Sequence, residues 1–293
     1  MEYPSSNFYK GLIVITHGLG GSTRRFGLRR IARRLSKDGF AVLKLNLRGA
    51  GSGRYLTNSN YSARCSNDII SVIKLVRNKL FLESKYTKFI KGNIPVYGIG
   101  LSLGGTILLN ACLDYENRKP LLDGLACVST PLDLLTCSSC IDKPRNYFYQ
   151  KWLIKRLKNQ ILNSQFNLNE DSNLINRKLI KEIKTIKEFD EKLTAPSWGY
   201  KSVYDYYFKA SPLFRIKKSF ERLPPALFIH AKDDPWVPYE STLKLKKIFI
   251  NSFSDISILI TEKGGHNGFH SPLGCWSDEV VANWLNLNFK NKE

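Results

Sequence analysis

Short apolar runs alternate along most of the chain with segments in which apolar residues recur at helical spacing. The runs at 11–16, 41–46, 94–99, 125–129, 226–230 and 256–260 have the composition of buried strands. Helical spacing follows over 24–37, 66–82, 240–249 and 278–287, among other stretches. Strands and helices that alternate in this way predict an α/β fold: a mostly parallel sheet with helices on both faces.

The alternation stops between 134 and 210, where no convincing strand is found. Helical patterns fill this stretch at 147–163 and 172–190, and the aromatic-rich 198–208 follows them. We therefore predict a helical cap inserted at 134–210, over the carboxyl ends of the strands, where ligands bind in open α/β sheets. The core would then comprise 1–133 and 211–293.

A serine lies at the apex of a strand–turn–helix unit that runs from Ile94 to Asp114. Its turn reads Gly-Leu-Ser-Leu-Gly, with Ser102 between Gly100 and Gly104. This G-x-S-x-G pattern is typical of a nucleophile elbow, in which glycines leave room for the strand to fold back into the helix. An ordinary glycine-rich turn can carry the same letters, so the partners of Ser102 elsewhere in the chain decide the interpretation.

Two further residues complete a catalytic pattern, and each follows an expected strand. Asp234 comes after 226–230 in the sequence Asp-Asp-Pro-Trp-Val-Pro, and His266 comes after 256–260 in Gly-Gly-His. The chain order serine, aspartate, histidine predicts a triad of Ser102 as nucleophile, His266 as base and Asp234 as the carboxylate that orients it. Asp233, next to Asp234, remains an alternative for the acid.

A second glycine-rich turn follows the first expected strand, as His-Gly-Leu-Gly-Gly from His17. A turn at this position supplies one half of an oxyanion hole. We expect the backbone N–H groups of Leu19 and Leu103 to stabilise negative charge on a substrate oxygen. We interpret His17 as a structural anchor of the turn, and His230 and His270 as structural or pocket-rim residues.

The charge is strongly basic: 45 Lys and Arg residues stand against 25 Asp and Glu residues, for a net charge of +20. Basic residues are spread over the whole chain, which favours general sequence bias over a dedicated binding patch. The alternative is peripheral contact with an anionic membrane, for which the arginines of 24–37 are candidates. No nucleic-acid-binding module is recognisable, and nucleic acid is not an expected partner.

Little else in the sequence suggests additional chemistry. Cys137 and Cys140 form a lone C-x-x-C with no second pair, and we predict no metal site and no cofactor. No apolar stretch approaches the roughly 20 residues that span a bilayer, and the first residues lack the layout of a signal peptide. These features lead us to expect a cytoplasmic protein of undetermined oligomeric state.

Several segments together resemble the YheT-like family of α/β-hydrolases, which is related to animal abhydrolase-domain phospholipases and plant embryogenesis-associated proteins. The resemblance spans about 11–289, and its most family-specific part is FDEKLTAPSWGYKSVYDYYFKAS at 189–211. It implies the α/β-hydrolase fold, hydrolysis of carboxylic esters, and the roles given above to Ser102, Asp234 and His266. Members of that family usually carry further strands before the first one found here, so we expect those N-terminal edge strands to be missing and 41–46 to be an exposed edge.

The sequence thus predicts a serine esterase that forms an acyl-enzyme on Ser102, with a small-molecule or lipid ester as substrate. The aromatic residues of 198–208 are candidates for an acyl pocket or for simple packing of the cap. Thioester hydrolysis or acyl transfer would use the same residues. A non-catalytic lipid-binding protein on a hydrolase fold is the alternative from another class.

Overall fold

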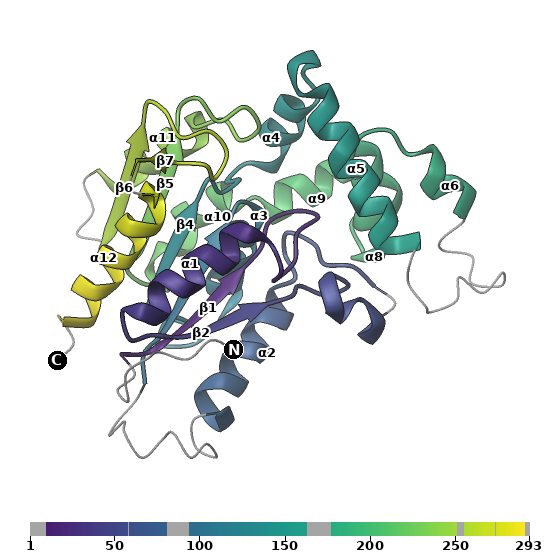
Figure 1. Cartoon of the computed structure of the whole chain (residues 1–293). Coiled ribbons are helices and arrows are strands. Elements are labelled where there is room, and N and C mark those ends of the chain that lie inside the picture. Colours follow the sequence, from purple (N-terminus) through teal and green to yellow (C-terminus); the bar gives the residue numbers. More distant parts are fainter. Residues whose placement is uncertain are drawn as a thin grey trace.

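A parallel sheet forms the centre of the molecule (Figure 1). The computed structural model describes residues 10–57, 59–80, 94–162, 177–250, 255–272 and 274–290. The strands are β1 (Leu12–Thr16), β2 (Ala41–Leu45), β3 (Val96–Leu101), β4 (Gly124–Val128), β5 (Ala226–Ala231) and β6 (Ile256–Thr261). They lie in the order β2-β1-β3-β4-β5-β6, and every neighbouring pair is parallel. Because all six run in one direction, their carboxyl ends share one edge.

Helices cover both faces of this sheet. The buried side chains of α1 (Phe26–Lys37) and α12 (Trp276–Lys290) pack on one face, and those of α2 (Ser66–Leu75), α3 (Leu103–Asp114) and α11 (Glu240–Phe249) pack on the other. β1, β4 and β5 are buried along their whole length, which explains why they read as continuous apolar runs. The predicted α/β class is confirmed, and each predicted strand is found within two residues of its expected position.

The segment between β4 and β5 contains helices joined by turns, and no strand, in its described parts. It contains α4 (Leu134–Ile141), α5 (Tyr147–Leu162), α6 (Arg177–Glu182), α7 (Ile186–Phe189), α8 (Ala195–Ser197) and α9 (Val203–Ala210), and α10 (Pro212–Ser219) leads back to the core. Apolar residues of α5, α6 and α7 form a small cluster of their own, apart from the two clusters on the sheet. The division into a core and a cap at 134–210 stays a prediction.

Some details differ from the sequence-based expectations. Within 134–146 no helix was expected, yet α4 forms there, and Asp133 caps it by accepting a hydrogen bond from the N–H of Thr136. The helix expected over 172–190 is interrupted between α6 and α7, and 172–176 lies outside the described residues. The helix expected over 66–82 is regular only in α2, to Leu75, and the π turn at Val76–Leu80 follows it. Residues 81–82 lie outside the described residues.

Short elements complete the structure. The 3-10 turns are η1 (Gly51–Leu56), η4 (Pro144–Asn146) and η6 (Phe220–Arg222), the π turns are η2 (Val76–Leu80) and η5 (Asp190–Thr194), and β7 (His270–Ser271) pairs with β8 (Gly274–Cys275). β2 and β6 are the edge strands of the sheet across the described residues. Within the same ranges, no helix combines the length and apolar character that crossing a membrane requires.

Candidate active site

The turn from β3 into α3 holds Ser102 in a backbone conformation that non-glycine residues rarely adopt, with φ 54° and ψ −128°. A side chain at Gly100 would place its Cβ 2.2 Å from the Cα of Gly105, so the strand can fold back only because Gly100 has none. A Cβ at Gly104 would lie 2.5 Å from the carbonyl oxygen of Thr16. Gly104 therefore lets the end of β1 approach, and the collision expected there is with β1 and not with the turn itself.

His266 lies between Ser102 and Asp234 and contacts both. Its Nε2 is 2.9 Å from the Ser102 Oγ, and its Nδ1 is 2.8 Å from the Asp234 Oδ2. Ser102 follows β3, Asp234 follows β5 and His266 follows β6, so three turns at one edge of the sheet meet. The structure thus brings together the three residues singled out from the sequence.

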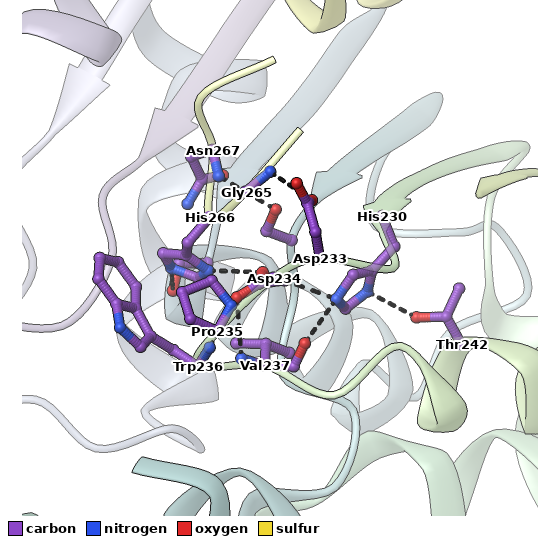
Figure 2. A network of polar contacts seen from close by, with 12 residues as sticks. His230, Asp233, Asp234, Pro235, Trp236, Val237, Thr242, Gly265, His266 and Asn267 are labelled. Atoms are coloured by element: carbon purple, nitrogen blue, oxygen red, sulfur yellow. Dashed lines mark hydrogen bonds and ion pairs between the residues drawn. The ribbon is translucent and has the colours of Figure 1, made fainter. Parts of the chain in front are cut away.

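Asp234 is fixed by the turn that carries it (Figure 2). Its Oδ1 accepts hydrogen bonds from the N–H groups of Trp236 and Val237, at 2.9 and 3.0 Å. Burial would raise the pKa of this carboxyl. The hydrogen bond and charge of His266 and the two N–H donors outweigh burial, and the pKa of Asp234 lies below its usual value. Asp234 is therefore an ionised acceptor at neutral pH.

Asp233 and Asp234 make different contacts, although they are adjacent. The Oδ1 of Asp233 accepts a hydrogen bond of 2.8 Å from the N–H of Gly265, directly before His266 (Figure 2). Asp233 thus holds the loop that carries the histidine, whereas Asp234 contacts the histidine ring. This geometry favours Asp234 over Asp233 as the carboxylate partner of His266.

The histidines interpreted as structural have partners that fit this interpretation. The Nε2 of His17 accepts the N–H of Leu47 at 3.2 Å, so its Nδ1 carries the proton that faces the Gly18 carbonyl, 2.9 Å away. Burial lowers the pKa of His17 to about 4. His230 is buried between the Thr242 hydroxyl and the Val237 carbonyl, and burial lowers its pKa as well.

The buried His230 also lies close to the carboxylate of Asp234. The Nε2 of His230 is 3.7 Å from the Asp234 Oδ2, and both side chains are buried (Figure 2). Its hydrogen bond to the Val237 carbonyl, at 2.9 Å, assigns the Nε2 proton to that contact. His270, by contrast, is exposed.

The turn after β1 lies directly against Ser102. A Cβ at Gly18 would be 3.0 Å from the Cβ of Ser102 and 3.4 Å from its Oγ. The N–H of Gly21 closes this turn on the Gly18 carbonyl at 3.0 Å, which leaves the amide of Leu19 outside the closing bond. Leu103 is the first residue of α3, where an amide has no acceptor within the helix. Leu19 and Leu103 both line the cavity beside Ser102.

The cavity at Ser102 and His266 is narrow, with a volume of about 80 Å³. Apolar side chains from the helices over the sheet form its roof, among them Leu134, Tyr149 and Leu153. The ring of Tyr149 stacks on Trp236 with centroids 3.4 Å apart, and the Trp236 ring lies 4.7 Å from that of His266. The sequence did not single out either aromatic residue.

The aromatic residues expected to line an acyl pocket divide into three groups. Tyr206 and Tyr207 line the cavity, whereas Tyr204 and Phe208 are exposed. Trp198 and Tyr200 pack against the core instead. Tyr206 and Tyr207 therefore contribute to the pocket, whereas the other four residues do not line it.

Asp190 is a second acidic side chain on the cavity wall, and sequence reasoning gave it no role. Its Oδ2 accepts a hydrogen bond of 2.9 Å from the Tyr207 hydroxyl. Burial raises the pKa of Asp190 to about 6, although the hydrogen bonds from Thr194 and Tyr207 act in the opposite direction. Its place in the FDEKLT segment, the most family-specific stretch, was the signal that could have identified it.

All six cysteines are buried and none forms a disulfide. Cys137 lies on the cavity wall, and burial raises the pKa of its thiol well above the usual value. The Sγ of Cys140 faces the Pro235 carbonyl at 3.5 Å. Among the described residues, no His, Cys, Asp and Glu side chains group as a metal site.

Comparison with known proteins gives consistent matches over nearly the whole chain. The family model described as serine aminopeptidase, S33, matches residues 9–272. YheT of Escherichia coli (strain K12) is 26% identical, over 99% of this chain and 81% of YheT. A monoacylglycerol lipase of Saccharomyces cerevisiae is 30% identical, over 97% of this chain. The chain spans 60% of the length of that yeast relative.

A solved structure supports the fold. The crystal structure of the Paleococcus ferrophilus monoacylglycerol lipase superimposes with a TM-score of 0.58 at 20% identity, over 98% of this chain and 97% of the other. The resemblance to the YheT-like α/β-hydrolases is confirmed, and so is the α/β-hydrolase fold.

Proposed function

The chain belongs to the family described as serine aminopeptidase, S33, and we propose that it is a serine hydrolase that cleaves carboxylic esters. The observation that carries the proposal is the unbroken contact from Ser102 through His266 to Asp234, at 2.9 and 2.8 Å. Relatives named monoacylglycerol lipase and phospholipase support an ester substrate.

In the proposed first step, the Ser102 Oγ attacks the ester carbonyl while its proton passes to the Nε2 of His266. The Nδ1–H of His266 stays on Asp234, which stabilises the imidazolium. The N–H groups of Leu19 and Leu103 stabilise the oxyanion, and each such donor contributes roughly 3–4 kcal/mol in comparable sites. Collapse of the tetrahedral intermediate expels the alcohol, which takes the Nε2 proton and leaves the acyl group on Ser102.

Water completes the reaction by the same route. His266 accepts a proton from the attacking water, and the second tetrahedral intermediate releases the carboxylic acid as the proton returns to Ser102. Apart from the ester and water, both proposed steps use only groups of this chain. The burial of Asp234 and its low pKa support its role as a fixed anion throughout.

The size of the cavity bears on the substrate. Its volume of about 80 Å³ is well below the roughly 300–1,000 Å³ of sites that hold drug-sized ligands. We propose that short acyl groups fit the site as it stands, and that longer chains require the helices of 134–210 to move as a cap. The apolar roof suits an acyl chain better than a charged group.

The test is hydrolysis of p-nitrophenyl esters from acetyl to palmitoyl by the wild type and by Ser102→Ala. We expect turnover by the wild type, greatest for short chains, and a loss of roughly 10⁴–10⁶-fold in kcat for the variant. Circular dichroism checks that both proteins are folded. Equal activity of the two, or no activity of a folded wild type on any ester, would contradict the proposal.

A further inference from the structure

The outer side of α5 exposes a group of large aromatic side chains. Phe148 is 82% exposed, Tyr147 57% and Trp152 45%. Scattered single apolar residues are common on protein surfaces, but neighbouring aromatic rings on one helix indicate a contact surface. These three lie within two turns of α5.

Basic side chains surround these rings. Between 147 and 162, α5 contains Lys151, Lys155, Arg156 and Lys158 and no acidic residue. Lys151 lies over the Tyr147 ring at 5.9 Å and Arg156 over the Trp152 ring at 5.1 Å. The charge of this surface is therefore positive around an apolar centre.

The start of α1 extends the same surface from the core. Arg25, directly before α1, also lies over the Trp152 ring, at 5.3 Å from its centroid. Phe26, the next residue, is 76% exposed. We call this surface the α5 face. It consists of Arg25, Phe26, Tyr147, Phe148, Lys151, Trp152, Lys155 and Arg156.

The inner side of the same helix forms part of the active-site roof. Tyr149 and Leu153 line the cavity, and aromatic rings connect the surface with the site: Trp152 to Tyr149, Tyr149 to Trp236, and Trp236 to His266. The helix α5 therefore has the α5 face on its outer side and the wall of the active-site cavity on its inner side. Anything that binds the α5 face lies directly over the site.

We propose that the α5 face docks on an anionic phospholipid surface. Exposed aromatic rings insert at the boundary of headgroups and acyl chains, and Lys and Arg keep their charged ends among anionic headgroups. The alternation of rings and cations fits this boundary better than it fits a nucleic acid, which would select for stacking rings in a groove. The inference deepens the proposed function, since it gives lipid esters as the substrate class, but the binding itself needs no catalysis.

Co-sedimentation with vesicles tests the docking directly. Vesicles of phosphatidylcholine alone are compared with vesicles that also contain phosphatidylglycerol, and Ser102→Ala is used as the parent so that no lipid is consumed. We expect binding to the anionic vesicles only, and its loss at high salt.

Two changes on the α5 face and two matched changes elsewhere locate the binding. Phe148→Ser and the double variant Lys151→Glu/Lys155→Glu remove an exposed ring and reverse two exposed charges. Ile250→Ser and Lys246→Glu/Lys247→Glu make the same changes at the carboxyl end of α11. This end precedes β6, so it lies near the amino ends of the strands, away from the edge that carries the candidate site. Each basic residue near an anionic surface contributes about a factor of five to partitioning, so we expect the charge reversal on α5 to weaken binding roughly tenfold or more.

The outcomes separate docking from catalysis. If the inference holds, the α5 variants lose vesicle binding, the α11 variants keep it, and all of them, made in the catalytically intact protein, hydrolyse soluble p-nitrophenyl acetate at the rate of the wild type. Equal losses from α5 and α11 variants would show that net charge alone attracts the protein, and would overturn the assigned surface. Absence of binding to anionic vesicles, or self-association that the α5 variants abolish, would overturn the lipid partner. Failure of the wild type to hydrolyse any ester would refute the proposed function and leave the vesicle result standing.

Discussion

The edge of the sheet and the helices above it hold their site residues in different ways. At the edge, backbone N–H groups make directional hydrogen bonds that fix Ser102 and Asp234: the N–H of Ser102 donates to the Val128 carbonyl at 2.9 Å, and Asp234 accepts two N–H groups of its own turn. In the helices, Tyr149 is held by ring stacking and apolar contacts. Proton transfer needs reacting atoms in position to within about 0.5 Å, which a network of directional bonds supplies.

The difference suggests that chemistry and substrate fit can be altered separately. Changes at the sheet edge should reduce the rate for every substrate, because they displace the reacting atoms. Changes in the helices should alter which substrate is preferred, because they reshape a cavity of only about 80 Å³. Four predictions compare the two regions: Asp234→Asn and Tyr149→Ala test this separation by activity, and Gly104→Ala and Asp190→Asn compare the regions by stability.

The largest effect is expected from Asp234→Asn. An asparagine amide cannot accept the Nδ1 proton as the carboxylate does, and it favours the wrong tautomer of His266, so kcat should fall roughly 10⁴-fold for all esters. Asp233→Asn is the matched control, because Asp233 bonds only the loop at Gly265, and it should retain activity within about tenfold. If Asp233→Asn caused the larger loss in steady-state assays, the assignment of the acid would be reversed.

A large effect on stability is expected from Gly104→Ala. The new Cβ would lie 2.5 Å from the Thr16 carbonyl oxygen, and the displacement of β1 or α3 should cost about 2–3 kcal/mol of unfolding free energy. Gly199→Ala in the helical segment has φ 74° and open space around it, so only backbone strain of about 1 kcal/mol applies. Urea unfolding measures both. Equal costs would show that the approach of β1 to α3 is not as close as described.

A change of preference is expected from Tyr149→Ala. Removal of the ring enlarges the cavity roof, so kcat/KM for octanoyl relative to acetyl esters should rise about tenfold, within the range that pocket contacts contribute to discrimination. Tyr147→Ala, on the outer side of the same helix, should leave this ratio unchanged for soluble esters. A uniform fall in rate for all chain lengths would instead assign Tyr149 to the chemistry.

The smallest effect is a pH dependence of stability from Asp190. Its pKa of about 6 in the folded protein exceeds that of an ordinary aspartate, so the folded state holds a proton that the unfolded chain has released. Asp190 therefore destabilises the fold progressively as pH rises from about 4 to above 6, by about 1–2 kcal/mol since part of the side chain remains open to the cavity. Thermal unfolding of Asp190→Asn should show a gain over the wild type at pH 7 that disappears near pH 4. A gain independent of pH would contradict an elevated pKa.

The residues at strand ends were predictable because their signals are local. A glycine turn after a buried run fixes where Ser102 must lie, and parallel strands bring their carboxyl ends to one edge, so Asp234 and His266 could be placed beside it. The sequence left Asp233 as an alternative to Asp234, and it is the contacts in the structure that favour Asp234.

The helices over the site were predictable only as helices. Apolar spacing indicates which side of α5 is buried, but it does not say what that side contacts, so the stack of Tyr149 on Trp236 could not be foreseen. The same holds for Asp190, whose neighbour Tyr207 is 17 residues away, on another helix. α4 was missed because its eight residues are too short for a clear periodic pattern.

Covalent labelling tests the central claim most directly. A fluorophosphonate probe reacts with a serine only when a base activates it and an oxyanion hole accepts its oxygen. We predict that the folded wild type is labelled on Ser102, as identified by peptide mass spectrometry, and that Ser102→Ala and Asp234→Asn are not labelled on the same timescale. A folded wild type that stays unlabelled, or a label on another residue, would contradict the assignment of Ser102 as the nucleophile.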